Sequence, residues 1–128
     1  MSRRDARDIA FKLIFAYTFD NEKNNEALEE YTLSSDADDK AYVSEVYNGV
    51  IAHYDELMED VKNNAEKYDV SRLYKIDLAV ILLALYEIKF MSSIPFKVSV
   101  DEAVSMAHKY STEKSGKYIN GILSKFAR

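Results

Sequence analysis

Arginine side chains gather at the amino-terminus, within the run Ser2-Arg3-Arg4-Asp5-Ala6-Arg7. The guanidinium group is a planar fork that can hold a phosphate through two parallel hydrogen bonds. Arg4, Asp8 and Lys12 are also spaced by four residues, and opposite charges at this spacing stabilise an ordinary solvated helix face. The amino-terminus therefore allows two interpretations, a phosphate-binding segment and a solvated helix face, and Arg3, Arg4 and Arg7 are its candidate ligand-binding residues.

A second basic group lies near the carboxyl end, where Lys114, Lys117 and Tyr118 fall at the start of the last predicted helix. The free backbone amides of a helix amino-terminus also attract anions. Cations that follow a phosphate backbone, with an aromatic ring on which a base can stack, are typical of sites that bind single-stranded RNA. These side chains join the arginines as candidate RNA-binding residues.

Side chains that could support catalysis or hold a metal are scarce. His53 and His108 are the only histidines, and each stands alone on its predicted helix. The chain has no cysteine, which excludes disulfides, thiolate metal sites and cysteine nucleophiles. It also lacks the glycine-rich phosphate loop and the nucleophile elbow of common enzyme classes. We therefore expect no enzyme activity, no metal site and no cofactor.

Charge is distributed unevenly along the chain, although the net charge is -5. Residues 1–19 carry four basic and two acidic side chains, and residues 109–128 carry five basic and one acidic. Residues 20–69 instead carry four basic and fifteen acidic side chains. Because salt screens charges beyond about 10 Å, local potential decides binding. The pattern predicts RNA at the basic ends and a basic protein partner at the acidic middle.

The elements that must position these side chains are predicted to be helices throughout. With 3 Gly and 1 Pro in 128 residues, the chain has too few turn residues for a sandwich or barrel. We predict a single domain over residues 1–128. Apolar residues at helical spacing predict the following helices: Ala6 to about Phe19, Glu26 to about Thr32, two helices from Asp36 to about Tyr68 with a bend near His53 to Asp55, Arg72 to Phe90, one starting near Ser99, and Glu113 to Ala127.

Local signals refine two of these helices. Ser99 followed by Glu102 matches a capping box, which predicts a helix start at Ser99. Asn120-Gly121 would suit a hairpin, but helical apolar spacing continues through it, so we predict helix there and expect Gly121 to allow close packing or ligand approach. The most apolar run, Leu78 to Leu85, is far shorter than the roughly 20 residues of a membrane span, and no signal peptide is evident. We expect a core helix and no membrane association.

Several segments, taken together and in order, resemble the NusB family of bacterial transcription antitermination factors. The resemblance rests on Arg3-Arg4-Asp5-Ala6-Arg7, on Ile76 to Ile88, on Ile94-Pro95 followed by Val98 to Val104, and on Ser115-x-x-Tyr118-Ile119-Asn120-Gly121-Ile122-Leu123. It extends nearly from end to end. It implies an all-α fold of about seven helices in two subbundles, which agrees with the predicted elements.

The resemblance also implies a function and a set of site residues. NusB-like proteins bind the boxA element of ribosomal RNA leader transcripts together with the ribosomal protein NusE, and they help RNA polymerase to read through terminators. Carried over to this sequence, the resemblance implies RNA contacts for residues in both basic segments: Arg3, Arg4, Arg7, Lys117, Tyr118 as the stacking ring, and Asn120, which could equally be a packing residue. Lys114 stands near a position where the family often has an acidic residue, and we expect it to strengthen RNA binding.

The protein partner is expected on the acidic side, with Asp77 beside the core helix as a candidate contact. The acidic side chains could equally serve only solubility. The resemblance also leaves open a homodimer, and it implies a cytoplasmic location. An alternative function is an RNA-docking module that works with a ribosomal RNA methyltransferase, because NusB-like domains also occur fused to such enzymes. A helical adaptor that uses only its acidic face would instead bind no RNA.

Overall fold

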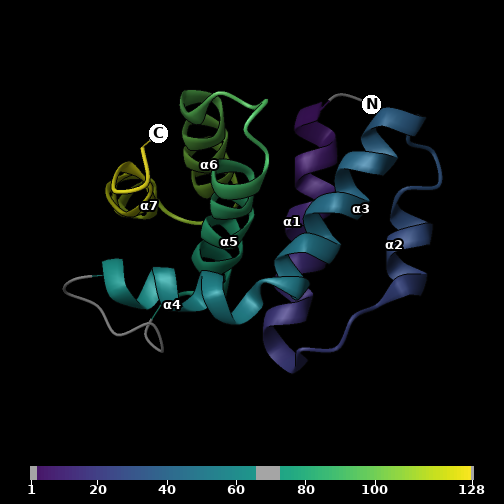
Figure 1. Ribbon diagram of the computed structural model, residues 1–128, viewed down its shortest axis with the longest axis horizontal. Coiled ribbons are helices and arrows are strands. Elements are labelled where there is room, and N and C mark those ends of the chain that lie inside the picture. The colour runs from purple at the N-terminus through teal and green to yellow at the C-terminus, as the bar shows by residue number, and fades with distance from the viewer. Residues whose placement is uncertain (1–2, 66–72, 128) are drawn as a thin grey trace.

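Seven α-helices make up the regular structure of the described residues, 3–65 and 73–127, in the computed structural model (Figure 1). Their bounds are α1 Arg3–Asp20, α2 Asn25–Tyr31, α3 Ala37–Ala52, α4 Tyr54–Asn64, α5 Lys75–Phe90, α6 Phe96–Tyr110 and α7 Glu113–Ser124. No strand occurs among these residues. The predicted all-α fold is confirmed. None of the helices within the described ranges has the length and apolar character to cross a membrane.

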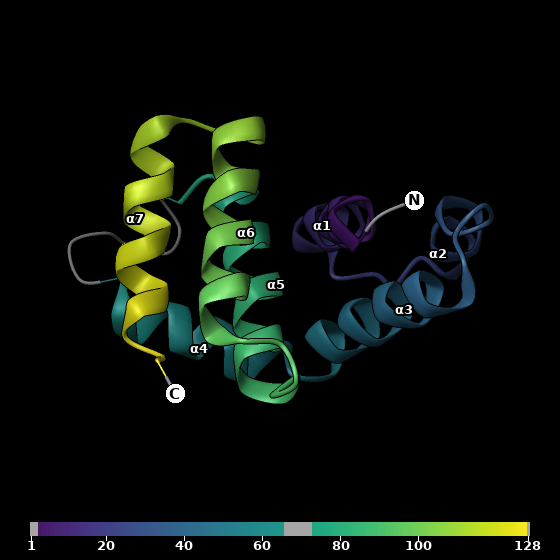
Figure 2. The same cartoon turned by 90° about the horizontal axis from the view of Figure 1, so that it is seen from above.

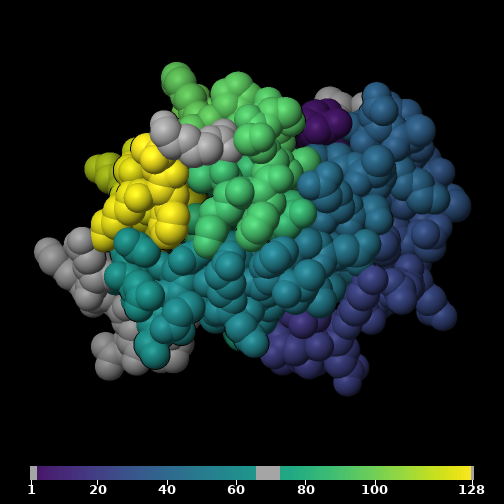
Figure 3. Space-filling model, viewed as in Figure 1, coloured from purple at the N-terminus to yellow at the C-terminus, as the bar shows by residue number. Residues whose placement is uncertain are grey.

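The helices form two groups that meet at α1, α3 and α5 (Figures 1 and 2). One group contains α1, α2 and α3, and the other contains α4, α5, α6 and α7. Helix α5 lies in the centre, with every residue from Asp77 to Ile88 buried. In the space-filling view the surfaces of α3 and α4 run together across one face of the molecule (Figure 3). The predicted arrangement in two subbundles around a buried helix is confirmed.

Helix boundaries follow local capping chemistry at several places. The Asp36 carboxylate accepts a hydrogen bond from the Asp39 backbone amide at 2.8 Å and starts α3 as predicted. The predicted bend is also present, because α3 ends at Ala52 and α4 begins at Tyr54. His53 occupies the bend, and its ring stacks on Phe90 with the centroids 4.2 Å apart. Thus the bend is fixed by a ring contact with the central helix.

The predicted helix start at Ser99 is wrong. Helix α6 begins at Phe96, directly after Pro95, whose fixed backbone angle suits a position at the beginning of a helix. Ser99 is therefore inside the helix and 2% exposed. Its hydroxyl donates to Glu87 Oε1 on α5 at 2.8 Å instead of capping α6. The buried Glu87 carboxylate on α5 is therefore the partner of the Ser99 side chain, in place of a capping contact within α6.

Gly49 lets α3 approach α5 closely, and its replacement by alanine should destabilise the protein. A Cβ atom at Gly49 would collide with the Tyr86 ring, which is 8% exposed and packed against Phe90 at a centroid distance of 5.1 Å. Overpacking of this kind costs about 1–3 kcal/mol, measurable as a lower free energy of unfolding in urea. Gly121→Ala is the matched control, because nothing lies within 4 Å of the added Cβ.

The Gly121 control should gain stability, by up to about 1 kcal/mol, since alanine favours a helix interior over glycine. Equal effects of the two substitutions would contradict the close approach at Gly49. The open space around Gly121 also corrects one expectation, since the helical prediction is confirmed but the expected close packing at this glycine is absent.

Candidate nucleic-acid interface

The start of α7 is built by a hydroxyl cap. The Thr112 side chain accepts a hydrogen bond from the Ser115 backbone amide at 3.1 Å, and this fixes the first turn. Lys114 and Lys117 of this helix are exposed, as is Asn120, and Tyr118 is half-buried. The predicted site residues of α7 are therefore accessible, on a helix whose first turn has a defined conformation.

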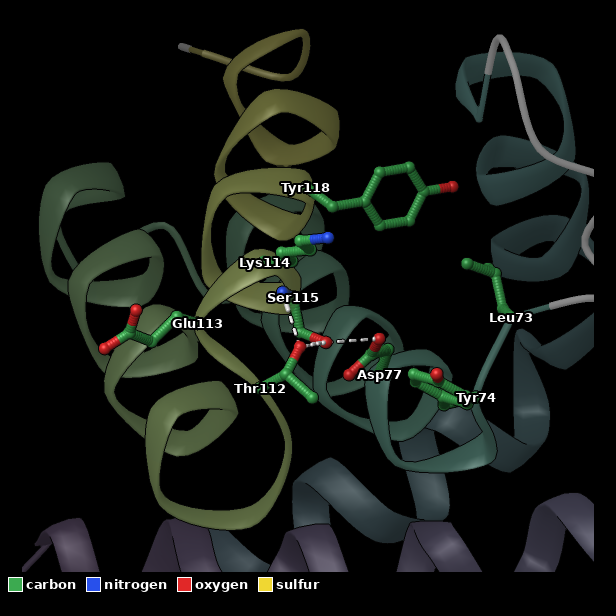
Figure 4. A pocket seen from close by; sticks show the side chains of 8 residues that line it. All are labelled: Leu73, Tyr74, Asp77, Thr112, Glu113, Lys114, Ser115 and Tyr118. Carbon is green, nitrogen blue, oxygen red and sulfur yellow. Dashed lines mark hydrogen bonds between the residues drawn. The ribbon is translucent and has the colours of Figure 1, made fainter.

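One side of α7 faces a pocket of about 690 Å³, called here the α5–α7 pocket (Figure 4). Lys114 and Tyr118 extend into it from α7, and Asp77 and Tyr74 come from the beginning of α5. The complete lining is Leu73, Tyr74, Asp77, Thr112, Glu113, Lys114, Ser115 and Tyr118. This volume lies in the ordinary range for small-molecule sites, about 300–1,000 Å³. A cation and two aromatic rings beside an open pocket suit a nucleotide.

The other side of α7 faces a separate groove of about 480 Å³ against α6, called here the α6–α7 groove. Lys117 and Asn120 line it together with His108. The His108 ring lies against the α7 backbone because Gly116 has no side chain, and its Nε2 is 2.5 Å from the place a Cβ would occupy. The predicted site residues of α7 thus divide between two sides of one helix.

The amino-terminal arginines lie away from both cavities of α7. Helices α5 and α6 stand between α1 and α7 in both ribbon views (Figures 1 and 2). Arg4 reaches across to α6, where it forms a forked pair with the Glu102 carboxylate at 3.0 and 3.1 Å. The predicted basic ends therefore form two separate patches along the surface, with α6 between them.

Arg3 and Arg4 remain accessible although each has an acidic partner. The Arg3 side chain is 42% exposed, pairs with Asp39 at 3.3 Å and lies 4.5 Å from the Tyr42 ring centroid. The Arg4 side chain is 67% exposed, and its hydrogen bond with Glu102 raises its pKa. The Arg4–Glu102 pair is exposed, and exposed ion pairs are weak, so a phosphate can compete for the Arg4 guanidinium. The Arg3 pair is partly buried, because the Asp39 side chain is only 7% exposed.

The predicted phosphate contact of Arg7 is wrong in this structure, because the side chain is buried. Arg7 is 5% exposed and donates to the fully buried Glu87 at 2.9 and 3.3 Å. Burial lowers the pKa of Arg7, but the hydrogen bonds and charge of Glu87 outweigh this effect and raise it. Tyr42 and Ser99 also donate hydroxyl hydrogen bonds to Glu87. Arg7 therefore joins α1 to α5 inside the protein.

Asp77 is not on the outer acidic surface where a protein partner was expected to meet it. It is 4% exposed and accepts a hydrogen bond from the Ser115 hydroxyl at 2.8 Å (Figure 4). This contact ties α5 to the first turn of α7 and places Asp77 at the floor of the α5–α7 pocket. Asp77 therefore lies inside a pocket and not on the outer acidic surface.

His108 and Tyr74 are among the lining residues that were not identified from the sequence as site residues. His108 was expected to be an ordinary solvated or hydrogen-bonded side chain, but it lines the α6–α7 groove. Tyr74, 64% exposed, lines the α5–α7 pocket. The eight-residue separation of His108 from Gly116 across a helix connection gave no periodic signal. In residues 3–65 and 73–127, no three metal-ligating side chains are grouped as a metal site would require.

Comparisons with known proteins agree with this architecture. The chain is 38% identical to the transcription antitermination protein NusB of Clostridium botulinum, over 98% of this chain and 99% of that protein. The structure of T. maritima NusB superposes with a TM-score of 0.90 at 32% identity, covering 99% of this chain and 91% of that one. A crystal structure of the antitermination factors NusB and NusE in complex with dsRNA shares the fold, with a TM-score of 0.86 at 24% identity over 97% of this chain and 94% of that one. A model of the NusB family matches residues 4–128, and the chain belongs to the NusB family.

Proposed function

We propose that this chain is a non-catalytic, RNA-binding transcription antitermination factor of the cytoplasm. In this proposal it binds boxA-type RNA together with the ribosomal protein NusE, within the RNA polymerase antitermination complex. The observation that carries the proposal is the α5–α7 pocket, in which Lys114 and Tyr118 stand beside the capped start of α7. Curated relatives named as antitermination proteins and a structural neighbour with NusE and dsRNA support it.

In this proposal the accessible side chains make different kinds of contact with the RNA. Lys114 and Lys117 attract phosphates at the start of α7, where the helix dipole adds positive potential. Tyr118 offers a ring face for a base, which is a contact that single-stranded RNA can make and a stacked duplex cannot. Arg3 and Arg4 supply a second cationic patch beyond α6. RNA that reaches both patches must cross α6.

A basic protein partner fits the opposite character of α2 and the beginning of α3. Exposed carboxylates gather there, from Glu26, Glu29 and Glu30 of α2 to Asp36 and Asp38 at the start of α3. Complementary charge of this kind speeds encounter and disfavours wrong partners. In the proposal, NusE docks on this acidic side and leaves the start of α7 free for RNA.

Fluorescence anisotropy with labelled boxA-type RNA tests this function. We expect the RNA to bind more tightly than a scrambled sequence, with NusE increasing the affinity, and single-stranded RNA to bind better than its duplex. If Arg3, Arg4, Lys114 and Lys117 each neutralise one phosphate, log Kobs should fall with log salt with a slope of about -3. Equal affinity for boxA and scrambled RNA, with and without NusE, would refute specific recognition.

A further inference from the structure

Arg3, the first residue of α1, is held on two sides by side chains of α3. Its Nε donates to Asp39 Oδ1 at 3.3 Å, and its guanidinium carbon lies over the Tyr42 ring, 4.5 Å from the ring centroid. Asp39 and Tyr42 are both buried, whereas the Arg3 side chain is 42% exposed. These residues, called here the Arg3 clamp, thus combine two buried partners with one accessible cation.

The two α3 side chains of the clamp are fixed from inside the protein. Asp39 lies in the first turn of α3, where its backbone amide donates to the Asp36 carboxylate at 2.8 Å. The Tyr42 hydroxyl donates to the fully buried carboxylate of Glu87 on α5. Arg3 is the member that reaches the surface, where the beginning of α1 lies beside α3 (Figure 3).

The clamp occupies one edge and one face of the Arg3 guanidinium. The Nε donor belongs to Asp39, and one flat face lies over Tyr42, but neither Nη group forms a hydrogen bond or ion pair with another described residue. Two parallel N–H groups from such an edge match two oxygens of a phosphate. The Nη edge of Arg3 can therefore bind a phosphate while its contacts with Asp39 and Tyr42 stay in place.

Arg4 provides the contrast within the same segment. Its Nε and one Nη both donate to the Glu102 carboxylate, at 3.1 and 3.0 Å, so its fork is already occupied. Arg4 must release Glu102 before these atoms can hold a phosphate, whereas Arg3 keeps its acidic partner. A side chain that is already held in its binding conformation also loses less conformational entropy when the ligand arrives. Arg3 should therefore contribute more to RNA affinity than Arg4.

We propose that Asp39 and Tyr42 are positioning residues for RNA binding, which hold Arg3 so that its Nη groups bind one phosphate of the strand. The proposal rests on the RNA-binding function proposed above, and it assigns the main phosphate contact of the amino-terminal patch to Arg3. Asp39 and Tyr42 act through Arg3 and do not touch the RNA. Charge alone predicts the opposite effect for Asp39, because loss of a carboxylate near the strand should strengthen binding.

Two substitutions that remove the same charge test the role of Asp39. Labelled single-stranded boxA-type RNA is titrated into each variant at saturating NusE, and binding is followed by fluorescence anisotropy. Asp39→Asn keeps an oxygen that can accept from Arg3 Nε, so it should bind RNA at least as tightly as the wild-type protein. Asp39→Leu has no acceptor and should bind about threefold more weakly than Asp39→Asn, the cost of ordering one long side chain. In an Arg3→Ala background this difference should disappear.

A second pair of variants isolates the Tyr42 ring. Tyr42→Phe and Tyr42→Leu both lose the hydrogen bond to Glu87, but only phenylalanine keeps an aromatic face beneath Arg3. Tyr42→Leu should bind RNA about twofold more weakly than Tyr42→Phe, as expected for one cation–π contact at an accessible site. This difference should also disappear when Arg3 is replaced by alanine.

Substitutions of Arg3 itself leave the core unchanged, so they keep the test valid if a Tyr42 variant does not fold. Arg3→Ala should weaken RNA binding more than Arg4→Ala and should reduce the salt slope by about 0.7. Arg3→Lys should keep the wild-type salt slope, because the charge remains, but it should bind RNA more weakly than the wild-type protein. An ammonium group is a point charge and cannot form the planar fork.

The contrary outcomes separate this proposal from the proposed function. Equal RNA affinities of Asp39→Asn and Asp39→Leu, or a difference that persists in the Arg3→Ala background, overturn the positioning role of Asp39. A larger loss in Arg4→Ala than in Arg3→Ala overturns the assignment of the main phosphate contact. In both cases specific binding of boxA-type RNA leaves the proposed function in place. If no RNA binds with NusE present, the proposed function fails and the role of the clamp fails with it.

Discussion

Arg7→Ala should unfold at a markedly lower temperature than the wild-type protein, with a loss of about 3–5 kcal/mol in the free energy of unfolding. The substitution leaves the Glu87 carboxylate, which is fully buried, without its counter-charge. Tyr42 and Ser99 still donate to Glu87, but neither carries a positive charge. Differential scanning calorimetry should record a fall in Tm of roughly 10 °C or more.

Glu87→Gln supplies the matched control, because it removes the buried charge and keeps an acceptor for the hydroxyl groups. In the double variant with Arg7→Ala, much of the lost stability should return, and the coupling energy of this cycle measures the pair. Arg4→Ala breaks only an exposed pair with Glu102 and should leave Tm nearly unchanged. An Arg7→Ala variant with wild-type Tm and weakened RNA binding would contradict the buried role and restore the phosphate contact.

The Arg7 result shows where reasoning from sequence stops. The run of arginines indicated phosphate contacts because charge and spacing are local properties, but the Arg7 partner, Glu87, lies 80 residues away. Other charged residues at the beginning of α1 also have partners on distant helices. One interpretation of the sequence placed Arg4 and Asp8 together on a solvated helix face, but Arg4 pairs with Glu102, and Asp8 accepts from Lys109 Nζ at 2.8 Å. Tertiary partners took these charges from their helical neighbours.

The helical spacing of apolar residues predicted most of the helices correctly. The charge pattern predicted fewer of the contacts at the site. The buried stripe of α1 and the apolar α5 were visible in the spacing of side chains, since burial repeats with the helical period. The bend at His53 followed instead from length, because one uninterrupted helix over the whole periodic segment would be too long for a compact domain. The predicted helix start at Ser99 was wrong because Ser99 and Glu102 match a capping motif, whereas the Ser99 hydroxyl donates to Glu87 on another helix. The pocket itself had no signal, because its walls come from the beginnings of two helices far apart in the chain.

The division of α7 into two sides leads to the second prediction. Reversing both charges, in Lys114→Glu with Lys117→Glu, should weaken RNA binding by more than about tenfold at moderate salt, since two attractive phosphate contacts become repulsive. The neutral pair of alanine substitutions should reduce the salt slope by about 1.4, at roughly 0.7 for each phosphate on single-stranded RNA. Both slopes are read from anisotropy titrations at several salt concentrations.

The control for each single reversal must make the same change of charge without touching either cavity. Lys97 is 84% exposed at the beginning of α6, whereas α7 starts after the other end of that helix, so Lys97→Glu should change affinity only slightly.

The single variants then trace the path of the RNA. If Lys114→Glu is harmful and Lys117→Glu is neutral, the RNA stays on the α5–α7 pocket and does not enter the groove beside His108. If both are harmful and their effects add, the strand passes over the start of α7 and contacts both sides. Two neutral single variants would exclude α7 from the RNA surface and leave Arg3 and Arg4 as the remaining predicted contacts.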